Sequence, residues 1–469
     1  MGYREVMEPT ANPLPECSRC RELEQIIARH EARLRELEQK LEEALRSGKR
    51  QAAPFRKVGG PKILPKPPGR KSGESHGTHA HRATPGPEEV TEAINVPLPR
   101  QCAHCHSHDI KPLPEQEQQY QTEIPRVPIV RRFDIHLGTC QGCGRTVRGR
   151  HALQTSKVTG AASHQLGPQA HAAITVLNKE MGLSHGKVAA VFRQLFGITI
   201  ARATSARSQE RTALVCQSAY QQIRQTLQNS THSNSDETGW RVGGVMAWLH
   251  VFVSKRATCY VVDPTRSAGP ALDLFGREYA GTMGHDGWST YQAFLQAHHQ
   301  QCLTHILHRC KELRETLSYQ TSQLARQLST IFKKSLLWRD EHPQAKPRQR
   351  EAIVWNYVQQ LGELTDGRLR YRHPENRKLA KFAWNHITEW FRFLLDPLTA
   401  ASNSAAERAI RPAAVNRKVW GGNRTWAGAQ RQGVLLSVLR TLWQRSLDTL
   451  HFLAQARCST RPILIPAEP

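Results

Sequence analysis

The feature that most constrains the fold is a change in the spacing of apolar residues near residue 233. Before that point, apolar residues recur mostly at helical spacing. After it come three short runs rich in β-branched and aromatic residues, separated by turn signals, at 240–242, 245–253 and 258–262. A helix over 268–275, a strand over 281–285 and a helix over 289–296 are expected next. This order predicts an α/β domain at 229–453.

The segment before this change is predicted to be helical. Helices are expected at 170–181, capped by Gly182, at 185–196, ending at Gly197, and at 202–215. Such a series is compatible with a helix-turn-helix DNA-binding module at 151–228, although helix pairs are also common as plain packing units.

The amino-terminal region divides into two parts. Residues 17–47 carry apolar residues at heptad spacing, which predicts a coiled coil and a route to homo-oligomers, although His30 weakens the seam. A lone amphipathic helix is the alternative. Residues 48–100 are rich in Pro, Gly and Lys and read as a basic linker, in which Arg70 and Lys71 are candidate nucleic-acid contacts.

The charge of the chain indicates a polyanionic partner. Lys and Arg outnumber Asp and Glu by 65 to 40, giving a net charge of +25 and a pI near 10.0, and phosphate neutralisation supplies most nonspecific nucleic-acid affinity. A basic protein without such a partner and an anionic membrane surface are the alternatives. No run of 18 apolar residues and no apolar amino-terminal stretch occur, so we expect no membrane partner, no secretory signal and an intracellular protein.

Two pairs of cysteines predict a structural zinc site. Cys102 and Cys105 form one Cys-x-x-Cys pair, and Cys140 and Cys143 form another after 34 intervening residues. A two-residue spacer lets both thiolates face one ion, so a zinc-binding domain is expected at 101–150. The rival ligands near the first pair are three histidines, His104, His106 and His108.

A further pair, Cys17 and Cys20, opens the predicted coiled coil. No second pair lies near it. It is either without a metal partner or a metal site that bridges a dimer.

Three acids form a candidate catalytic set. Asp236 enters the first strand run, Asp286 ends a later strand and Glu407 lies in a helix. Carboxylates can hold two Mg²⁺ or Mn²⁺ ions that activate the attacking oxygen and stabilise the leaving oxygen in phosphodiester exchange. Spacing alone does not separate this set from surface carboxylates or helix caps among the 40 acids.

The motifs around these acids resemble those of bacterial transposases of the insertion-sequence-66 family. The matching segments are Asp236–Trp240, His285–Tyr291, Gln300–His305 and Asn403–Pro412, together with the linker motifs and both zinc pairs. The resemblance runs in order from about residue 17 to residue 453. One departure is Ser404, where the family commonly has a second Asn.

The resemblance implies an RNase H-like catalytic domain with a DDE triad of Asp236, Asp286 and Glu407. Glu407 follows Asp286 by 121 residues, so a helical insertion is expected at about 309–397. The segment Cys302-x-x-His305 resembles a signature of several DDE transposase groups, which implies a catalytic or supporting role for His305. A zinc site of Cys302, His305 and Cys310 is the alternative.

Residues beside Glu407 supply further candidates. Arg408, Arg411, Arg417 and Lys418 could hold DNA phosphates or could be ordinary surface charge. Three tryptophans beside these motifs, Trp240, Trp288 and Trp420, are expected to pack in the core rather than to stack on bases.

The resemblance implies a DNA transposase that cleaves the ends of an insertion sequence and transfers their 3′-hydroxyls to target DNA by two-metal phosphoryl transfer. The expected partners are the terminal repeats, target DNA, further copies of the chain and companion proteins of the element. The expected location is the cytoplasm, at the nucleoid. The alternatives are a catalytically inactive or domesticated DNA-binding protein and a two-metal nuclease.

Overall fold

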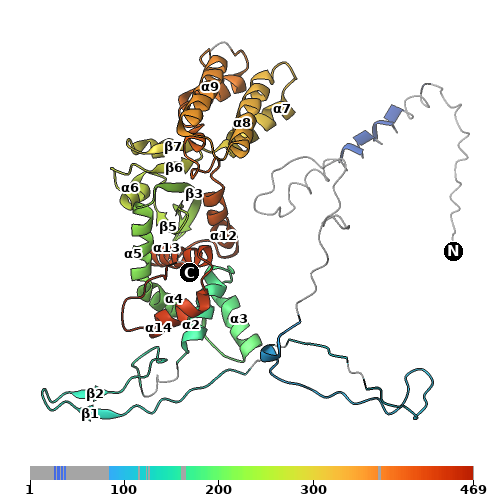
Figure 1. Cartoon of the computed structure of the whole chain (residues 1–469), viewed down its shortest axis with the longest axis vertical. Helices are drawn as coiled ribbons and strands as arrows, with labels where there is room; N and C mark the ends of the chain where they lie inside the picture. Colours follow the sequence, from blue (N-terminus) through green and yellow to red (C-terminus); the bar gives the residue numbers. More distant parts are fainter. Residues whose placement is uncertain are drawn as a thin grey trace, which may run out of the picture. The chain divides into compact units, whose positions relative to one another are not determined.

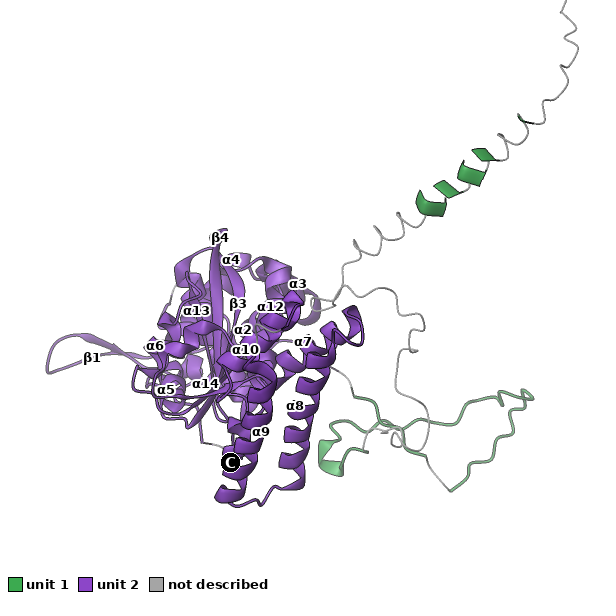
Figure 2. Ribbon diagram, turned by 90° about the horizontal axis from the view of Figure 1, so that it is seen from above, with its two compact units in different colours: residues 1–123 green, residues 124–469 purple. Residues whose placement is uncertain are grey.

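The computed structural model describes residues 84–114, 117–122, 124, 127–159, 165–367 and 371–467, with scattered residues between 19 and 38. The chain divides into two compact units, Met1–Glu123 and Ile124–Pro469 (Figure 2). The first unit contains a short 3-10 helix, η2 (Pro87–Glu89). Arg70, Lys71, Cys17 and Cys20 lie outside the described residues, as does most of the predicted coiled coil.

The second unit is an α/β fold, as the sequence predicted, and it is built on a mixed five-stranded sheet (Figure 1). The strand order is β5-β4-β3-β6-β7. β4 pairs antiparallel with both β3 and β5, whereas β6 runs parallel to β3 and β7 parallel to β6. The strands are β3 (His232–Val242), β4 (Val245–Val253), β5 (Thr258–Asp263), β6 (Thr282–His285) and β7 (His298–Gln301).

The long hairpin of β3 and β4 follows from local sequence. Gly243 and Gly244 both have positive φ, at 59° and 86°, which a two-residue turn between antiparallel strands requires. The second half of β4 is buried along its whole length. A strand buried on both sides lies inside a sheet that is covered on both faces.

Helices cover the two faces of this sheet. On one face, α5 (Gln217–Gln228) and α6 (Gly269–Phe275) pack with Phe252 of β4 in one hydrophobic core. On the other face, α12 (Ser404–Trp420) packs an alanine-rich side against Val251 of the same strand. Phe252 and Val251 are neighbours and point to opposite faces. The helix α13 (Trp426–Gln444) contributes to both cores beside β5.

The amino-terminal part of the second unit has a hairpin and a helical group. The hairpin pairs β1 (Leu137–Thr139) with β2 (Thr146–Arg148). The helices are α2 (Pro168–Lys179), α3 (His185–Phe196) and α4 (Arg202–Val215), against which α14 (Thr449–Cys458) packs. Thus α3 and α4 have the predicted bounds, and Gly197 ends α3 in the left-handed conformation, with φ 66°.

A group of helices between β7 and α12 forms a separate core at one end of the sheet (Figure 1). Leu328, Phe332, Leu361 and Trp390 are among its buried side chains. Its first helix already begins at residue 303. The helices are α7 (Leu303–Thr316), α8 (Gln323–Glu341), α9 (Pro347–Thr365), α10 (Pro374–Asn385) and α11 (Arg392–Leu395).

Several predicted elements differ from the structure. The first strand begins at His232 rather than 240, and β7 was not predicted. The helix expected over 289–296 is only a 3-10 helix, η4 (Ser289–Ala293). Gly182 does not cap α2, because Glu180 is the C-cap. Within the described residues, none of the helices combines the length and apolarity that crossing a membrane would require.

Candidate active site

Asp236 and Asp286 lie level with each other on neighbouring strands. β3 and β6 are parallel, and their register pairs Asn234 with Gly284. Two residues further along are Asp236, within β3, and Asp286, directly after β6. The register therefore brings two acids that are 50 residues apart in sequence to the carboxyl end of β6.

The turn after β6 fixes the carboxylate of Asp286. The backbone N–H of Trp288 donates to Asp286 Oδ1 at 3.2 Å. Between them, Gly287 has φ +89°, and a Cβ there would lie 2.8 Å from Gln301 Oε1 and 2.9 Å from Phe382 Cζ. Only glycine satisfies both the conformation and the space, so this position in the Asp-Gly-Trp motif is required by the turn.

Glu407 comes from a helix rather than a strand, in the first turn of α12. Ala406, Ala409 and Ala413 are buried against the sheet. Their small side chains allow the helix to approach β3 closely, which places Glu407 beside the strand that carries Asp236.

Asn403, the N-cap residue of α12, holds this helix start in place. Its side-chain Nδ2 donates to the backbone carbonyl of Ser235 at 2.8 Å, and its Oδ1 accepts from Asn234 Nδ2 at 3.0 Å. Its backbone N–H donates to Cys302 Sγ at 3.1 Å. One residue thus joins β3, the start of α7 and the start of α12. Sequence reasoning gave it no role, although it lies within the motif that contains Glu407.

The carboxylates form a site of concentrated negative charge. Burial, followed by the charges of Asp286, Glu237 and Glu407, raises the pKa of Asp236 from 3.8 to about 7. The backbone N–H of Glu237 donates to Asp236 Oδ1 at 2.8 Å and opposes the rise only in part. The charges of both other predicted acids therefore act on Asp236. A divalent cation among them would relieve this repulsion.

His305 lies beside Glu407, with 3.7 Å between Nδ1 and Oε1. A hydrogen bond with Cys302, together with the charges of Cys302, Glu407 and Asp286, raises its pKa to about 9 despite partial burial. The side chain is 53% exposed. His305 therefore presents a positive charge at the solvent side of the acidic site.

A fourth acid, Glu237, lies beside the site and was not predicted. The side chain of Glu237 is 2% exposed and lies 2.7 Å from Arg266 Nη2. Tyr291 donates its hydroxyl to the other carboxylate oxygen at 2.9 Å. The Arg266 guanidinium lies 3.8 Å from the ring centroid of Trp288. These contacts tie the segment that follows Asp286 to β3, and the consecutive acids at 236 and 237 were the available signal.

The other predicted residues near Glu407 divide by exposure. Arg408, Arg411 and Lys418 are exposed, and their spacing of three and seven residues puts them on one side of α12. Arg417 is partly buried, and its Nη1 lies 3.7 Å from the point that a Cβ would occupy at Gly239 of β3. Trp240 is fully buried and meets Trp420 edge-to-face at 5.8 Å, as expected for core packing.

The two cysteine pairs form matching turns, each within its own unit. Cys102 N–H donates to Ser107 O at 2.8 Å, and Cys140 N–H donates to Arg145 O at 2.9 Å. Four residues after these cysteines, His106 and Gly144 have positive φ, at 59° and 66°. Backbone hydrogen bonds to the sulfur, led by those from Cys105 and Cys143, lower the pKa of Cys102 and Cys140.

Cys310 lies apart from Cys302 and His305. It is buried in the core of the helical group, where burial raises its pKa to about 11. Within the described residues, the third potential ligand beside Cys302 and His305 is Glu407 instead. The alternative zinc set that included Cys310 is therefore not assembled.

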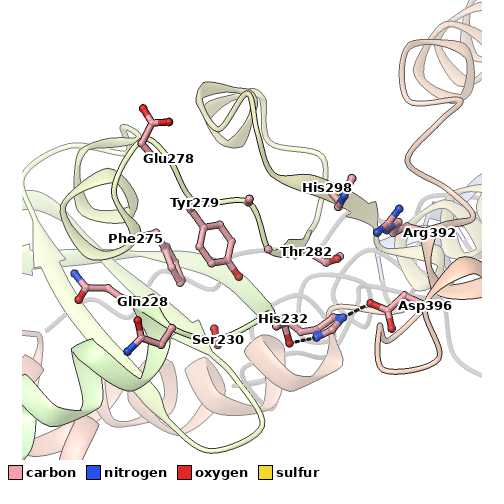
Figure 3. A pocket seen from close by; sticks show the side chains of 14 residues that line it. Gln228, Ser230, His232, Phe275, Glu278, Tyr279, Thr282, His298, Arg392 and Asp396 are labelled. Atoms are coloured by element: carbon pink, nitrogen blue, oxygen red, sulfur yellow. Dashed lines mark hydrogen bonds and ion pairs between the residues drawn. The ribbon is translucent and has the colours of Figure 1, made fainter.

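A cavity of about 570 Å³ lies elsewhere, at the amino-terminal ends of β3, β6 and β7. Figure 3 shows His232 directed toward Asp396, with which it is hydrogen-bonded, below His298 and Arg392. The residues that line this cavity include none of the predicted site residues. Asp286, in contrast, follows the carboxyl end of β6.

Comparison with known proteins gives one family. The family model for the transposase IS66 family matches residues 163–431. This range includes Asp236, Asp286, His305, Glu407 and the basic residues of α12 but neither cysteine pair. No curated protein matches the chain.

Proposed function

The chain belongs to the transposase IS66 family, and from this premise we propose that it cleaves the ends of an insertion sequence and transfers their 3′-hydroxyls to target DNA. The family implies a nucleic-acid-processing enzyme that binds DNA. The observation that supports the finer proposal is the environment of Asp236: burial, followed by the charges of Asp286, Glu237 and Glu407, raises its pKa to about 7.

The three acids suit hard divalent cations. Their donor set is entirely carboxylate oxygen, which Mg²⁺ and Mn²⁺ prefer, and Glu407 is 38% exposed, so water positions stay open. When bound, such ions would activate the attacking oxygen and stabilise the leaving oxygen of a phosphodiester. Asp236 would be held in its ionised form by them, and the Trp288 N–H would keep Asp286 oriented.

The chain's own cations would hold the DNA. His305, whose pKa is raised to about 9 and which lies beside Glu407, would bind the scissile phosphate. Arg408, Arg411 and Lys418 would contact the backbone along α12, with Arg417 closer to the sheet. Phosphate contacts of this kind position DNA without reading its sequence.

The domain is compatible with the RNase H-like fold that the family resemblance implies. Its sheet has three antiparallel strands followed by two parallel ones, with helices on both faces and an inserted helical group before α12. We infer that the inserted helices shape the surface around the site. β3 and the turn after β6 carry Asp236 and Asp286.

The cysteine pairs support a structural zinc site. Both turns direct backbone N–H groups to the first cysteine of the pair, an arrangement that favours thiolates as metal ligands. Zn²⁺ bound by Cys102, Cys105, Cys140 and Cys143 would have no open position and would stabilise the domain rather than catalyse.

The amino-terminal helix supports self-association. Its described residues are helical, and Ile27, Leu34 and Leu37 are 56%, 59% and 48% exposed. Burial of this stripe against a second copy would let one assembly hold both ends of an element. Companion proteins of the element would join this assembly, which would act on the nucleoid DNA of the cytoplasm.

Cleavage and joining of an element-end DNA in Mg²⁺ test the proposal. Asp236→Asn should bind the DNA as the wild type does and should neither cut nor join. Asp273→Asn, an exposed acid in α6, is the matched control and should retain activity. Cutting by Asp236→Asn would overturn the assignment.

The same assay separates the alternative functions. Cleavage without joining by the wild type would identify a two-metal nuclease. Salt-sensitive end binding without cleavage, unchanged by Glu407→Ala, would identify a DNA-binding protein that lacks catalysis.

A further inference from the structure

A thiol, an imidazole and a carboxylate meet at the edge of the acidic site. One ligand atom each from Cys302, His305 and Glu407 lies within 4.8 Å of the other two. We infer that these residues form a separate Zn²⁺ site and that zinc bound there inhibits the enzyme by occupying Glu407. The inhibitory part rests on the proposed function, whereas the binding site does not.

The spacing of the ligand atoms suits a tetrahedral ion. Zinc binds nitrogen and oxygen at about 2.0 Å and sulfur at about 2.3 Å, so neighbouring ligand atoms lie roughly 3.3–3.7 Å apart. His305 Nδ1 and Glu407 Oε1 are 3.7 Å apart. Closure of the set around an ion therefore needs only small side-chain movements.

The backbone builds this site where two helices begin. Cys302 is the N-cap of α7, His305 lies in the first turn of that helix and Glu407 lies in the first turn of α12. Leu303 N–H donates to Ala401 O at 2.9 Å, which joins the two helix starts. The amino ends of helices favour negatively charged ligands such as a thiolate and a carboxylate.

An outer hydrogen bond orients the sulfur. The Asn403 N–H donates to Cys302 Sγ at 3.1 Å, and outer bonds of this type commonly fix metal ligands. Cys302 is 2% exposed and forms the floor of the site, whereas His305 and Glu407 are 53% and 38% exposed. An ion can enter from solvent, and water can complete its coordination.

The donor types separate this site from the Mg²⁺ site. Thiolate and imidazole favour Zn²⁺ over Mg²⁺, which prefers oxygen ligands. Among the residues that the structure describes, this is the one group of three or more His, Cys, Asp and Glu ligands within such a short range. Because Glu407 is common to both sites, zinc bound to Cys302 and His305 would remove one ligand from the catalytic ions.

Zinc content of the full chain tests the site directly. After dialysis against buffered free Zn²⁺ on the order of 10 µM, the wild type should hold one zinc per chain more than Cys302→Ser. His305→Ala, a change at an exposed side chain, should lose the same equivalent, which guards against misfolding of the Cys302 variant. Cys310→Ser, a buried thiol in the same helix, is the matched control and should keep it. Zinc bound at Cys102, Cys105, Cys140 and Cys143 contributes equally to all of these proteins.

Equal zinc content in the wild type, Cys302→Ser and His305→Ala would overturn the site, as would loss of the extra zinc in Cys310→Ser. The inhibitory role is tested by DNA joining in Mg²⁺, with each protein compared to its own zinc-free activity. Zinc should reduce joining by the wild type at least tenfold and by Cys302→Ser less than twofold. Equal inhibition of both would overturn that role, while a wild type that never cleaves would overturn the proposed function and leave the zinc counts as the test of the site.

Discussion

Replacement of Asp236 by asparagine is expected to stabilise the metal-free protein. The pKa of this carboxyl is about 7 in the folded protein and 3.8 ordinarily. Folding therefore favours the protonated form, so stability that is fully present below pH 4 is lost as the pH rises through 7. Asparagine removes the charge and can still accept the hydrogen bond from the Glu237 N–H through its own Oδ1.

The size of the effect follows from the pKa difference. A rise of about 3 pKa units corresponds to about 4 kcal/mol, at about 1.36 kcal/mol per unit. Because Asp236 is only partly buried, solvent screens the repulsion, and we expect between about 2 and 4 kcal/mol. With an unfolding entropy of about 2.1 cal/mol/K per residue, the second unit should melt roughly 3–6 °C higher at pH 8.

Thermal unfolding in a chelating buffer measures this difference between pH 5 and pH 8. The advantage of Asp236→Asn should shrink by more than half at pH 5, because protonation removes the repulsion in the wild type. Saturating Mg²⁺ should raise the melting temperature of the wild type and should affect the variant much less. The control, Asp273→Asn, should melt with the wild type at every pH. The reasoning would be refuted if Asp236→Asn were less stable than the wild type at pH 8. It would also be refuted if the variant melted above the wild type by the same margin at pH 5 and pH 8.

Three further predictions test the surroundings of the acids. His305→Gln should reduce DNA joining at least tenfold. Wild-type activity should fall as the pH rises through about 9, where His305 loses its proton, and a pH–rate profile of His305→Gln should lack this fall. Arg266→Ala should lower the free energy of unfolding by about 3 kcal/mol, because it leaves the buried Glu237 carboxylate without its cation; denaturant unfolding should show partial recovery in the double variant with Glu237→Gln. Asn403→Ala should cost about 2 kcal/mol for two lost side-chain hydrogen bonds and should reduce joining, whereas Ser404→Asn should stay within twofold of the wild type.

Elements with a regular apolar pattern could be predicted closely from the sequence. The bounds of α3 and β4 agree with the structure because burial of one helix face, or of most of a strand, leaves a local signature. The bounds of α4 agree as well, although most of its buried residues are polar. The first eight residues of β3 and all of β7 are mostly polar, and their strand conformation comes from pairing with distant segments. Such pairing leaves little local signal.

The acids of the site could be identified from motifs, whereas their supports could not. Glu237 and its partners Arg266 and Tyr291 are 29 and 54 residues apart in sequence, and only the turn after β6 and the end of β5 bring them together. The role of Glu407 beside Cys302 was likewise hidden, because the nearer Cys310 was the obvious third ligand in sequence. In the fold, α7 carries Cys310 away into the helical core.

Asp286 and Glu407 are 121 residues apart in sequence, and the helical insertion makes up most of that interval. The two ends of the insertion nevertheless lie close together. At its start, Gln301 N–H donates to Glu389 O at 3.1 Å and Leu303 N–H to Ala401 O at 2.9 Å. At its end, Asn403 bonds to Cys302 and to β3. These bonds close the insertion at its base, so changes in the length or packing of α8 to α10 need not move Glu407. The position of the third acid therefore depends on Asn403 and the alanine-rich side of α12, and only indirectly on the helices that precede it.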